Sequence, residues 1–257
     1  MAQIRVATYN IFSNALLRDV HALQDSLSID ILGVQGYSPT LERAGQLASQ
    51  GISQIGNHWI YSVGRLFGTP PGLSAPVLPA GQAHETLHGL SVISNFQFSG
   101  IMLPGLGPDN DPPPRNPGGP GTAGRNAVYT YVNIEGTDLY IINTGTAYTK
   151  RYTESSAFRR AQIQMLKRNV LDSIPPDAPT ILMGHFNATK NNPDMEPLVE
   201  EYLRVPSEEL TRPGFVRGAP SQPIDHLFFR NMQLTGTSLH IDSTLSKRPM
   251  LIADFRL

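Results

Sequence analysis

Cysteine is absent from the 257 residues, and the chain also lacks an excess of charge of either sign. Without cysteine there are no disulfides and no thiolate metal sites, and the redox compartment stays undetermined. Lysine and arginine number 20 against 21 acidic residues, so there is no basic excess of the kind that binds a polyphosphate backbone. A dedicated nucleic-acid binder is therefore disfavoured.

Long apolar runs are missing as well. The first residues, Met1 to Ala7, have neither the basic segment nor the apolar stretch of a signal peptide, and no segment reaches membrane-spanning length. We therefore expect a cytoplasmic protein without a membrane partner. Hydrophobic residues make up 40% of the chain, which is enough for one large core, and we expect a single domain over residues 1–257.

Strand and helix patterns alternate along the chain. Ile4 to Tyr9 is typical of a buried strand, Asp19 to Leu27 has apolar residues at helical spacing, and Ile29 to Gln35 is a second apolar strand. A long helix with most of its apolar residues on one stripe is predicted over Ser155 to Ser173. Further strands are predicted at Leu90–Ser94, Val128–Ile134, Leu139–Asn143, Thr180–Met183, His226–Phe229 and Met250–Phe255. This order predicts an α/β protein with a pair of sheets and helices outside.

Two segments rich in glycine and proline interrupt this pattern, residues 64–81 and residues 100–125. Runs such as Pro-Pro-Pro and Gly-Gly-Pro-Gly favour neither a helix nor a strand ladder. Irregular loops of this length in a compact domain are usually functional lids or disordered segments. We expect both segments to be irregular.

Eight groups of residues occur in one order along almost the whole chain. They are Thr8-Tyr9-Asn10-Ile11, Leu32-Gly33-Val34-Gln35, Gly89-Leu90-Ser91-Val92-Ile93-Ser94, Asn143-Thr144, Arg160-Ala161-Gln162, Ile181-Leu182-Met183-Gly184 with Phe186-Asn187-Ala188, Ile224-Asp225-His226, and Ser246 with Pro249. Together they resemble the endonuclease/exonuclease/phosphatase family. The resemblance implies a DNase I-like four-layer α/β sandwich, in which two mixed β-sheets pack face to face with helices outside. It also implies a pocket at the strand ends, where family members bind Mg²⁺ through acidic residues and an Asp orients a catalytic His.

The sequence departs from the family pattern at the positions that carry this chemistry. Gly36 stands where the family has a metal-binding Glu, and Gly145 stands where it has a phosphate-contacting His. His185 replaces the Asp of Gly-Asp-Phe-Asn, and Lys247-Arg248 replaces the final Asp-His. Mg²⁺ needs carboxylate oxygens to offset its dehydration, and a guanidinium cannot act as a base. We therefore predict a degenerate, metal-independent site with no metal and no cofactor.

Asn10, Asn187 and Asp225 remain of the family's polar set, and each altered position has two interpretations. Asp225 and Arg248 form either an ion pair that only locks the C-terminal strand or a rigid arginine for a ligand anion. Lys247 either substitutes for the charge of the missing ion or is a solvated surface lysine. His185 is either an acid or base in the pocket or an ordinary hydrogen-bonded histidine.

The remaining candidates concern the shape of the pocket and a competing motif. Gly36 and Gly145 either enlarge the pocket floor or reflect drift after loss of activity, and Tyr37 and Tyr148 either line its mouth or are ordinary surface tyrosines. Residues 84–88 spell His-Glu-Thr-Leu-His, which binds zinc when it lies on a helix. Gly81 and Gly89 bracket this motif and a strand follows, so the pattern favours a polar loop over a zinc site.

Three functions follow from these candidates. The first is a repurposed, metal-independent enzyme that cyclises or isomerises a small molecule, with His185, Asp225 and Arg248 as catalytic residues and Asn10, Asn187 and Lys247 among the ligand-binding ones. The second is a pseudoenzyme that binds an anionic ligand or a protein partner without turnover. The third is residual phosphodiesterase or phosphatase activity. Composition and motifs leave open whether any turnover occurs.

Overall fold

The strand predicted at the start of the chain is the central strand of one of two large sheets. The computed structural model describes residues 2–10, 17–37, 53–55, 58–60, 89–93, 99–103, 125–146, 155–206, 224–242, 245–246 and 248–257. The first sheet has the order β12-β13-β1-β2-β5, in which β1 and β2 are parallel and the other pairs are antiparallel. Its strands are β1 (Gln3–Asn10), β2 (Ile31–Tyr37), β5 (Gly89–Ile93), β12 (Gln233–His240) and β13 (Met250–Arg256).

The second sheet has six strands in the order β10-β11-β9-β8-β7-β6. Here β8 and β9 are parallel and every other pair is antiparallel, so both sheets are mixed. The strands are β6 (Ser99–Leu103), β7 (Arg125–Ile134), β8 (Thr137–Gly145), β9 (Thr180–His185), β10 (Leu203–Arg204) and β11 (Asp225–Arg230). Two short strands, β3 (Ser53–Ile55) and β4 (His58–Ile60), pair with each other.

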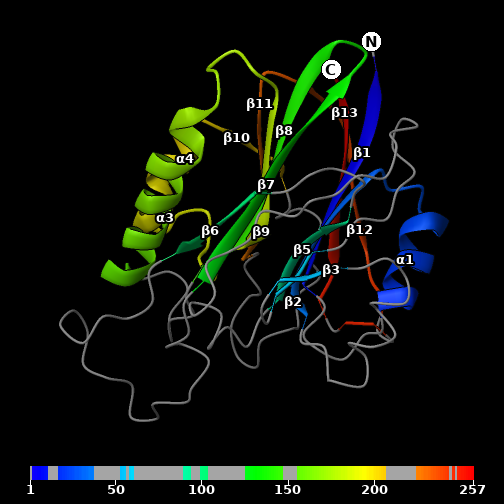
Figure 1. Ribbon diagram of the computed structural model, residues 1–257, viewed down its shortest axis with the longest axis horizontal. Coiled ribbons are helices and arrows are strands. Elements are labelled where there is room, and N and C mark those ends of the chain that lie inside the picture. Colours follow the sequence, from blue (N-terminus) through cyan, green and yellow to red (C-terminus); the bar gives the residue numbers. More distant parts are fainter. Residues whose placement is uncertain are drawn as a thin grey trace.

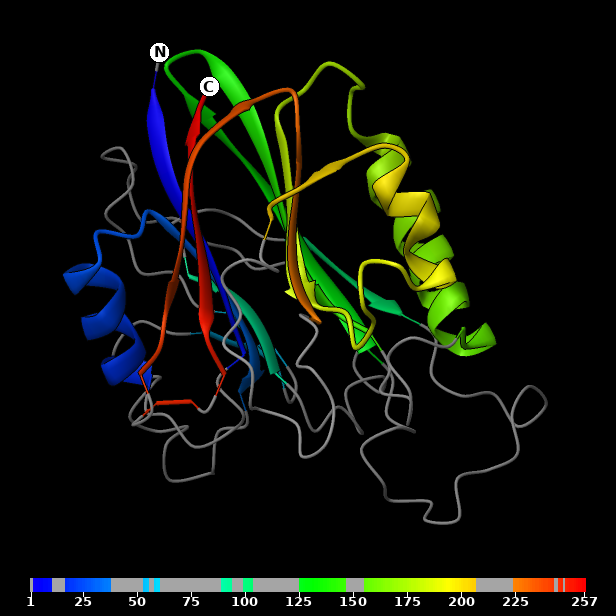
Figure 2. The same ribbon diagram turned by 180° about the vertical axis from the view of Figure 1, so that it is seen from behind.

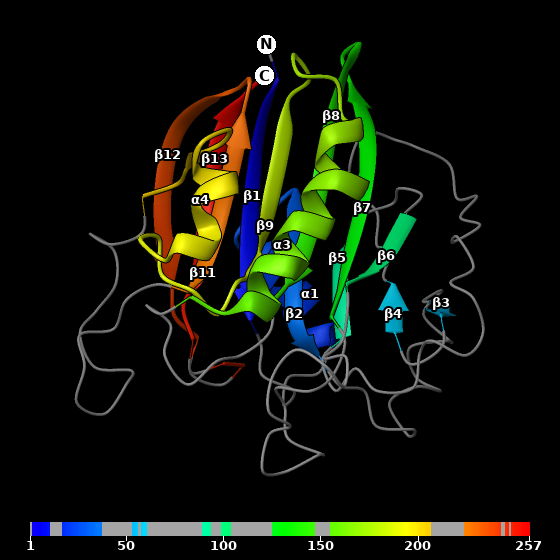
Figure 3. The same ribbon diagram turned by 90° about the vertical axis from the view of Figure 1, so that its left-hand side faces the viewer.

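Helices cover the outer face of each sheet. Figures 1 and 2 show α1 (Leu17–Ser26) outside the first sheet, and α3 (Ala157–Asn169) with α4 (Glu196–Val199) outside the second. Figure 3 shows α3 and α4 lying across the face of the second sheet. The order of layers is therefore helix, sheet, sheet, helix, and the predicted four-layer α/β sandwich is confirmed.

β1 shows why the first sheet is buried on both faces. Ile4 and Val6 belong to the core between the two sheets, whereas Ala7 and Tyr9 pack on the other side in the cluster that includes Val20 of α1. Successive side chains of a strand point to opposite faces, so a strand between two apolar layers needs apolar residues on both. A third cluster joins α3 to the outer face of the second sheet.

The long helix is confirmed, with its ends adjusted. Ser156 is the N-cap and its hydroxyl accepts from the backbone N of Arg159, which satisfies one of the free donors of the first turn. After Asn169 the chain tightens into the 3-10 helix η1 (Leu171–Ser173), and Pro175-Pro176 follows. The prediction of one helix to Ser173 therefore covered two kinds of helix.

The predicted irregular segment at residues 100–125 is wrong at both ends. Residues 100–103 belong to β6 and Arg125 begins β7, and the two strands pair from Ser99↔Tyr129 to Leu103↔Arg125. Pairing with β7 satisfies the backbone hydrogen-bonding groups around Gly100, although the composition of this segment suggested no strand pairing. Residues 104–124 and 64–81 lie outside the described part of the chain. β12 was also missed, because its alternation is weak and none of its eight residues is fully buried. No helix among the described residues is long and apolar enough to cross a membrane.

Candidate active site

Three of the predicted site positions form one row across the second sheet. His185 is the register partner of Gly145 in parallel β8 on one side and of Asp225 in antiparallel β11 on the other. The ends of three strands therefore bring together residues that lie up to 80 positions apart (225 − 145) in the chain. Cross-strand partners point to the same face of a sheet, so the side chains of His185 and Asp225 meet.

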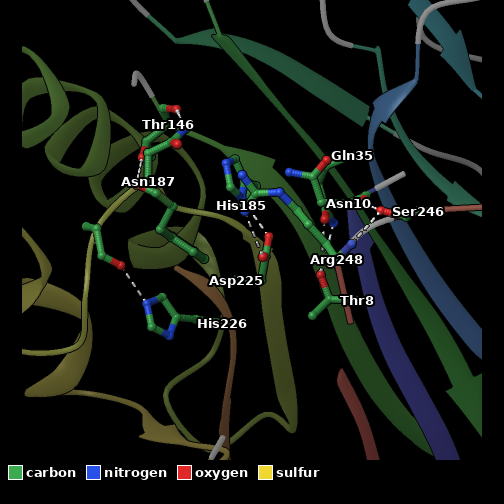
Figure 4. A network of polar contacts seen from close by, with 12 residues as sticks. Thr8, Asn10, Gln35, Thr146, His185, Asn187, Asp225, His226, Ser246 and Arg248 are labelled. Carbon is green, nitrogen blue, oxygen red and sulfur yellow. Dashed lines mark hydrogen bonds and ion pairs between the residues drawn. The ribbon is translucent and has the colours of Figure 1, made fainter. Parts of the chain in front are cut away.

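The imidazole of His185 and the carboxylate of Asp225 contact each other directly. Nδ1 of His185 lies 2.6 Å from Oδ1 of Asp225, and the two side chains are 13% and 16% exposed. Figure 4 shows them facing each other at the strand ends. Since a carboxylate only accepts hydrogen bonds, Nδ1 carries the proton in the neutral ring, and Nε2 is then the ring atom with a lone pair.

Arg248 reaches the same carboxylate from the segment just before β13. Its Nη1 lies 3.5 Å from Oδ2 of Asp225, and its side chain is 26% exposed. The backbone N of Arg248 donates to the hydroxyl of Ser246, which in turn donates to the carbonyl of Asn10 at the end of β1. Asp225 therefore links the two sheets at one end of the sandwich, and the predicted contact between Asp225 and Arg248 is present.

The neighbours of Asp225 favour its charged form. Burial by itself would raise the pKa of Asp225, but the charge and hydrogen bond of His185 lower it, and the charges of Arg248 and His226 act in the same direction. The net result is a pKa below the ordinary value of 3.8. At neutral pH the site therefore holds a carboxylate between an imidazole and a guanidinium.

The segment after His185 is anchored by its own side chains. Asn187 has a positive φ of 51°, and its amide nitrogen donates to the carbonyl of Thr146 at 2.8 Å. The backbone N of Thr146 donates to the carbonyl of His185 at 3.0 Å, and the hydroxyl of Thr146 donates to the carbonyl of Phe186. Asn187 is thus buried and bonded to the protein, in contrast to a purely ligand-facing role.

Gly184 is required by the close approach of β8. A Cβ atom at Gly184 would lie 2.0 Å from the backbone oxygen of Thr144. Backbone atoms of a central strand cannot move aside cheaply, so only glycine fits at this position. The absence of a side chain at Gly184 therefore lets β9 approach β8 just before His185.

A buried polar network lies beneath the row and connects the two sheets. Gln35 of β2 donates to Oδ1 of Asn143 in β8 at 2.7 Å and also contacts the hydroxyl of Thr8 in β1. Asn143 donates back to the carbonyl of Val34 at 3.1 Å. Because each amide has a partner in the opposite sheet, the network fixes the relative position of the strand ends.

The other predicted residues are placed only in part. Gly36 and Tyr37 lie at the end of β2, where the pairing with β5 shifts register between Gln35 and Tyr37. Tyr148, Lys247 and the His84 to His88 motif lie outside the described residues, so their predicted roles stay predictions.

Several residues that organise the site were missed by sequence reasoning. Arg159 and Asp194 are fully buried and form an ion pair, and His226 is fully buried with its Nε2 2.8 Å from the carbonyl of Ala188. One signal existed for Arg159. It lies on the buried stripe of α3 with Ile163 and Leu166, and a charged residue on an apolar stripe calls for a buried partner.

The family model described as "Endonuclease/Exonuclease/phosphatase family" matches residues 7–246, so the chain belongs to this family. The resemblance seen in the eight sequence segments is thereby confirmed. None of the curated proteins compared with the sequence matches it significantly.

Solved structures with the same fold cover almost the whole chain. A functionally unknown conserved protein from Enterococcus faecalis V583 is 16% identical, with 98% of this chain and 99% of that chain covered and a TM-score of 0.63. TDP2 from D. rerio, complexed with a single-stranded DNA product, is 12% identical over 100% of both chains with a TM-score of 0.61. Mannosyl-6-phosphatase from Bacteroides thetaiotaomicron is 15% identical, with 99% and 100% covered and a TM-score of 0.58. At such identities the likeness shows the fold alone.

Proposed function

We propose that this chain is a metal-independent enzyme on the endonuclease/exonuclease/phosphatase fold, in which His185 moves a proton on a small anionic molecule. The observation that carries the proposal is the 2.6 Å contact between Nδ1 of His185 and Oδ1 of Asp225. A carboxylate at this distance holds an imidazole in one tautomer and stabilises the imidazolium that forms when the ring accepts a proton. His185 is thus oriented as a general acid or base.

A histidine positioned by a carboxylate can raise a reaction rate substantially. General acid–base catalysis by a positioned side chain contributes about 10²–10⁴-fold in rate. Nε2 is the atom of His185 that accepts and returns the proton, because Nδ1 is bound to Asp225. A group that removes a proton at one atom and returns it at another catalyses an isomerisation or a cyclisation without an activated water. Such a reaction therefore needs only the imidazole of His185 and the carboxylate of Asp225 for its proton transfers.

Arg248 accounts for the proposed charge of the substrate. A guanidinium stays protonated at any accessible pH and binds carboxylates and phosphates through several N–H groups at once. It contacts Oδ2 of Asp225 and keeps part of its side chain exposed. An anion bound by Arg248 would therefore lie beside the ring of His185.

The donor set does not suit the Mg²⁺ that the family implies. Asp225 is the carboxylate of the described site, and its two oxygens already contact an imidazole and a guanidinium. Mg²⁺ is a hard ion that needs oxygen ligands in octahedral geometry, and a nearby fixed cation opposes it. Among the described residues no group of three or more His, Cys, Asp or Glu is placed to hold a metal ion. We therefore derive no catalytic step through a metal.

The ion pair between Asp225 and Arg248 also favours a second candidate, a pseudoenzyme that binds an anion without turnover. A bound anion would then stabilise the fold but exchange no proton. Residual hydrolysis of phosphate esters is the third candidate, supported by the shared fold of enzymes such as the mannosyl-6-phosphatase. The three candidates predict different outcomes, namely proton exchange, binding alone and release of phosphate.

One experiment separates them. Small carboxylates, inorganic phosphate and sugar phosphates are screened by thermal shift, and each organic ligand found is incubated with the protein in D₂O and examined by NMR and mass spectrometry. The proposal expects deuterium to enter a C–H position of the ligand, and His185→Gln to abolish this exchange while binding persists. Arg248→Met should abolish binding, and Arg168→Met, an exposed residue of α3, is the control.

The other outcomes contradict the proposal. Binding without any exchange supports the pseudoenzyme, and release of phosphate that needs added Mg²⁺ or Mn²⁺ supports hydrolysis. Calorimetry with Mg²⁺ or Mn²⁺ tests the metal directly, and binding tighter than about millimolar would argue against a metal-independent site.

A further inference from the structure

Arg159 of α3 is the largest fully buried side chain of the described residues, and its ion-pair partner is equally buried. Nη2 of Arg159 lies 2.9 Å from Oδ2 of Asp194 in η2 (Pro193–Met195), and both side chains are 0% exposed. Neither residue lies in any of the eight segments that carry the family resemblance. A pair of this kind needs an explanation, since charged side chains are almost never fully buried.

Stability by itself is a poor explanation for the pair. Burial lowers the pKa of Arg159, and the charge and hydrogen bond of Asp194 act against this effect without cancelling it. Taking two charges out of water costs about as much as their attraction returns, and well-packed apolar side chains in their place are often as stable. The contacts of the pair indicate what else it does.

From Arg159 a chain of hydrogen bonds leads to His185. Nη1 of Arg159 donates to the carbonyl of Asn187 at 3.0 Å, and the amide of Asn187 donates to the carbonyl of Thr146 at 2.8 Å. The backbone N of Thr146 then donates to the carbonyl of His185 at 3.0 Å. Figure 4 shows Asn187 and Thr146 beside His185 in this arrangement.

The positive φ of Asn187 makes this contact significant. A φ of 51° lies in the left-handed region, which non-glycine residues adopt uncommonly and asparagine more readily than most, so contacts that hold it matter. Arg159 holds the carbonyl of this residue, and the side chain of the same residue holds Thr146. The buried guanidinium therefore fixes the turn that directly follows His185.

Asp194 fixes Arg159 from the other side. Its Oδ1 accepts from the hydroxyl of Ser155 at 2.6 Å, and its Oδ2 accepts from the backbone N of Ser156 at 2.8 Å. Ser156 is the N-cap of α3, one turn before Arg159. The carboxylate thus ties η2 to the start of the helix and leaves the guanidinium one direction in which to point.

We propose that Arg159 and Asp194 are a positioning pair, which sets the orientation of the His185 ring through Asn187 and Thr146. The proposal rests on the role given to His185 above, but it concerns geometry and is measurable without a substrate. Removal of the pair should let the ring of His185 leave the carboxylate of Asp225. The second tautomer of the ring then becomes populated.

The test replaces both charges by apolar side chains of similar size, Arg159→Met with Asp194→Leu, and follows the ring nitrogens of His185 by ¹⁵N NMR at about pH 9, above the titration range of model imidazole. The wild type should show one tautomer, protonated at Nδ1. The double variant should show a mixture, with a melting temperature that falls by less than about 6 °C. The matched control is Lys167→Met with Glu201→Leu, an exposed ion pair that starts from the same helix, and it should leave the His185 signals unchanged.

Two further variants keep the proposal testable if the double variant does not fold. Asn187→Gly keeps the positive φ accessible but removes the bond to Thr146, so it should also mix the tautomers. Arg159→Lys keeps the charge and should restore the wild-type signals at least in part. Unchanged His185 signals in every folded variant of Arg159 or Asn187 would overturn the proposal. A wild type without the Nδ1 proton would instead contradict the proposed function, and the effect of the variants on His185 would still decide the positioning role.

Discussion

Asp194 and Asp225 are two carboxylates with similar partners and different surroundings. Asp194 accepts from a hydroxyl, a backbone N–H and the buried guanidinium of Arg159, and it is fully buried. Asp225 contacts one imidazole and one guanidinium, and its side chain is 16% exposed. All these donors to Asp194 come from the chain around the start of α3, whereas Asp225 is contacted by His185 of β9 and by Arg248, just before β13.

The difference separates a carboxylate that holds the backbone from one that contacts a titratable ring. With Nε of Arg160 3.4 Å from Oδ1, four donor groups from the protein face the carboxylate of Asp194, which leaves it little capacity for a ligand. Asp225 has fewer donors, and one of them is a titratable ring with a second nitrogen. The chain therefore uses an acidic residue with arginine twice, once to hold the backbone and once to hold a histidine.

The largest loss of stability is expected when the buried carboxylate of Asp194 is removed. Asp194→Ala leaves the charge of Arg159 buried without its partner, and the free energy of unfolding should fall by about 3–5 kcal/mol. Urea denaturation measures the loss. The Arg159→Met, Asp194→Leu double variant is the control, and it should lose far less. Equal losses in the two variants would mean that packing, and not the uncompensated charge, sets the effect.

A smaller loss of stability is expected from Gly184→Ala, which disturbs the contact between β8 and β9 and leaves Asp194 and Asp225 in place. The added methyl group collides with the backbone of Thr144, so the strand must shift at a cost of about 1–3 kcal/mol. Gly136→Ala, at a turn where a Cβ meets nothing within 4 Å, is a control for lost glycine freedom. A neutral Gly184→Ala would show that β8 and β9 separate easily.

Removal of the charge at the partly exposed carboxylate should cost about 1–2 kcal/mol in Asp225→Asn, since a charge-assisted hydrogen bond is lost. The effect depends on pH. The pKa of Asp225 lies below its ordinary value of 3.8 in the folded protein, so its stabilisation is complete above that value and is lost as the pH falls through the folded pKa. Unfolding free energies from pH 7 to pH 2 should therefore converge for the wild type and the variant on the acid side. A pH-independent difference would contradict the lowered pKa.

The smallest effect is expected at the exposed pair on α3. Lys167 contacts Asp172 at 2.9 Å and also Glu201, and all three side chains are more than a quarter exposed. Lys167→Met should change the free energy of unfolding by about 0.2–1 kcal/mol, because water and salt screen such pairs. Denaturation in low and high salt checks this. A loss as large as that of Asp194→Ala would mean that burial does not explain the difference between the exposed and the buried ion pair.

The fold was predictable from short-range patterns because most strands are buried on both faces. β2 and β9 contain the apolar runs Ile31-Leu32-Gly33-Val34 and Ile181-Leu182-Met183, and such runs stand out in a sequence. β12 did not stand out, because it is an edge strand with one partner, β13, and part of its surface in solvent. β6 was obscured by the glycine and proline that follow it, and only its pairing with β7 makes it a strand.

Motif order singled out candidate residues but not all of their contacts. Motif order pointed to His185, Asp225 and Arg248, and a contact between Asp225 and Arg248 was expected. The contact between His185 and Asp225 was not, because it depends on the antiparallel register of β9 with β11. Arg159 was overlooked since its partner, Asp194, lies 35 positions further along the chain (194 − 159).

The order of apolar and polar residues by itself determined the layers of this protein, because burial of apolar surface depends on which residues are present and how they alternate. Only the tertiary structure decided which charges meet. The energy of an ion pair or hydrogen bond depends on ångström distances and on exclusion of water, and both arise when strands and helices distant in the chain pack together. The pairing of His185 with Asp225, and of Arg159 with Asp194, is the result.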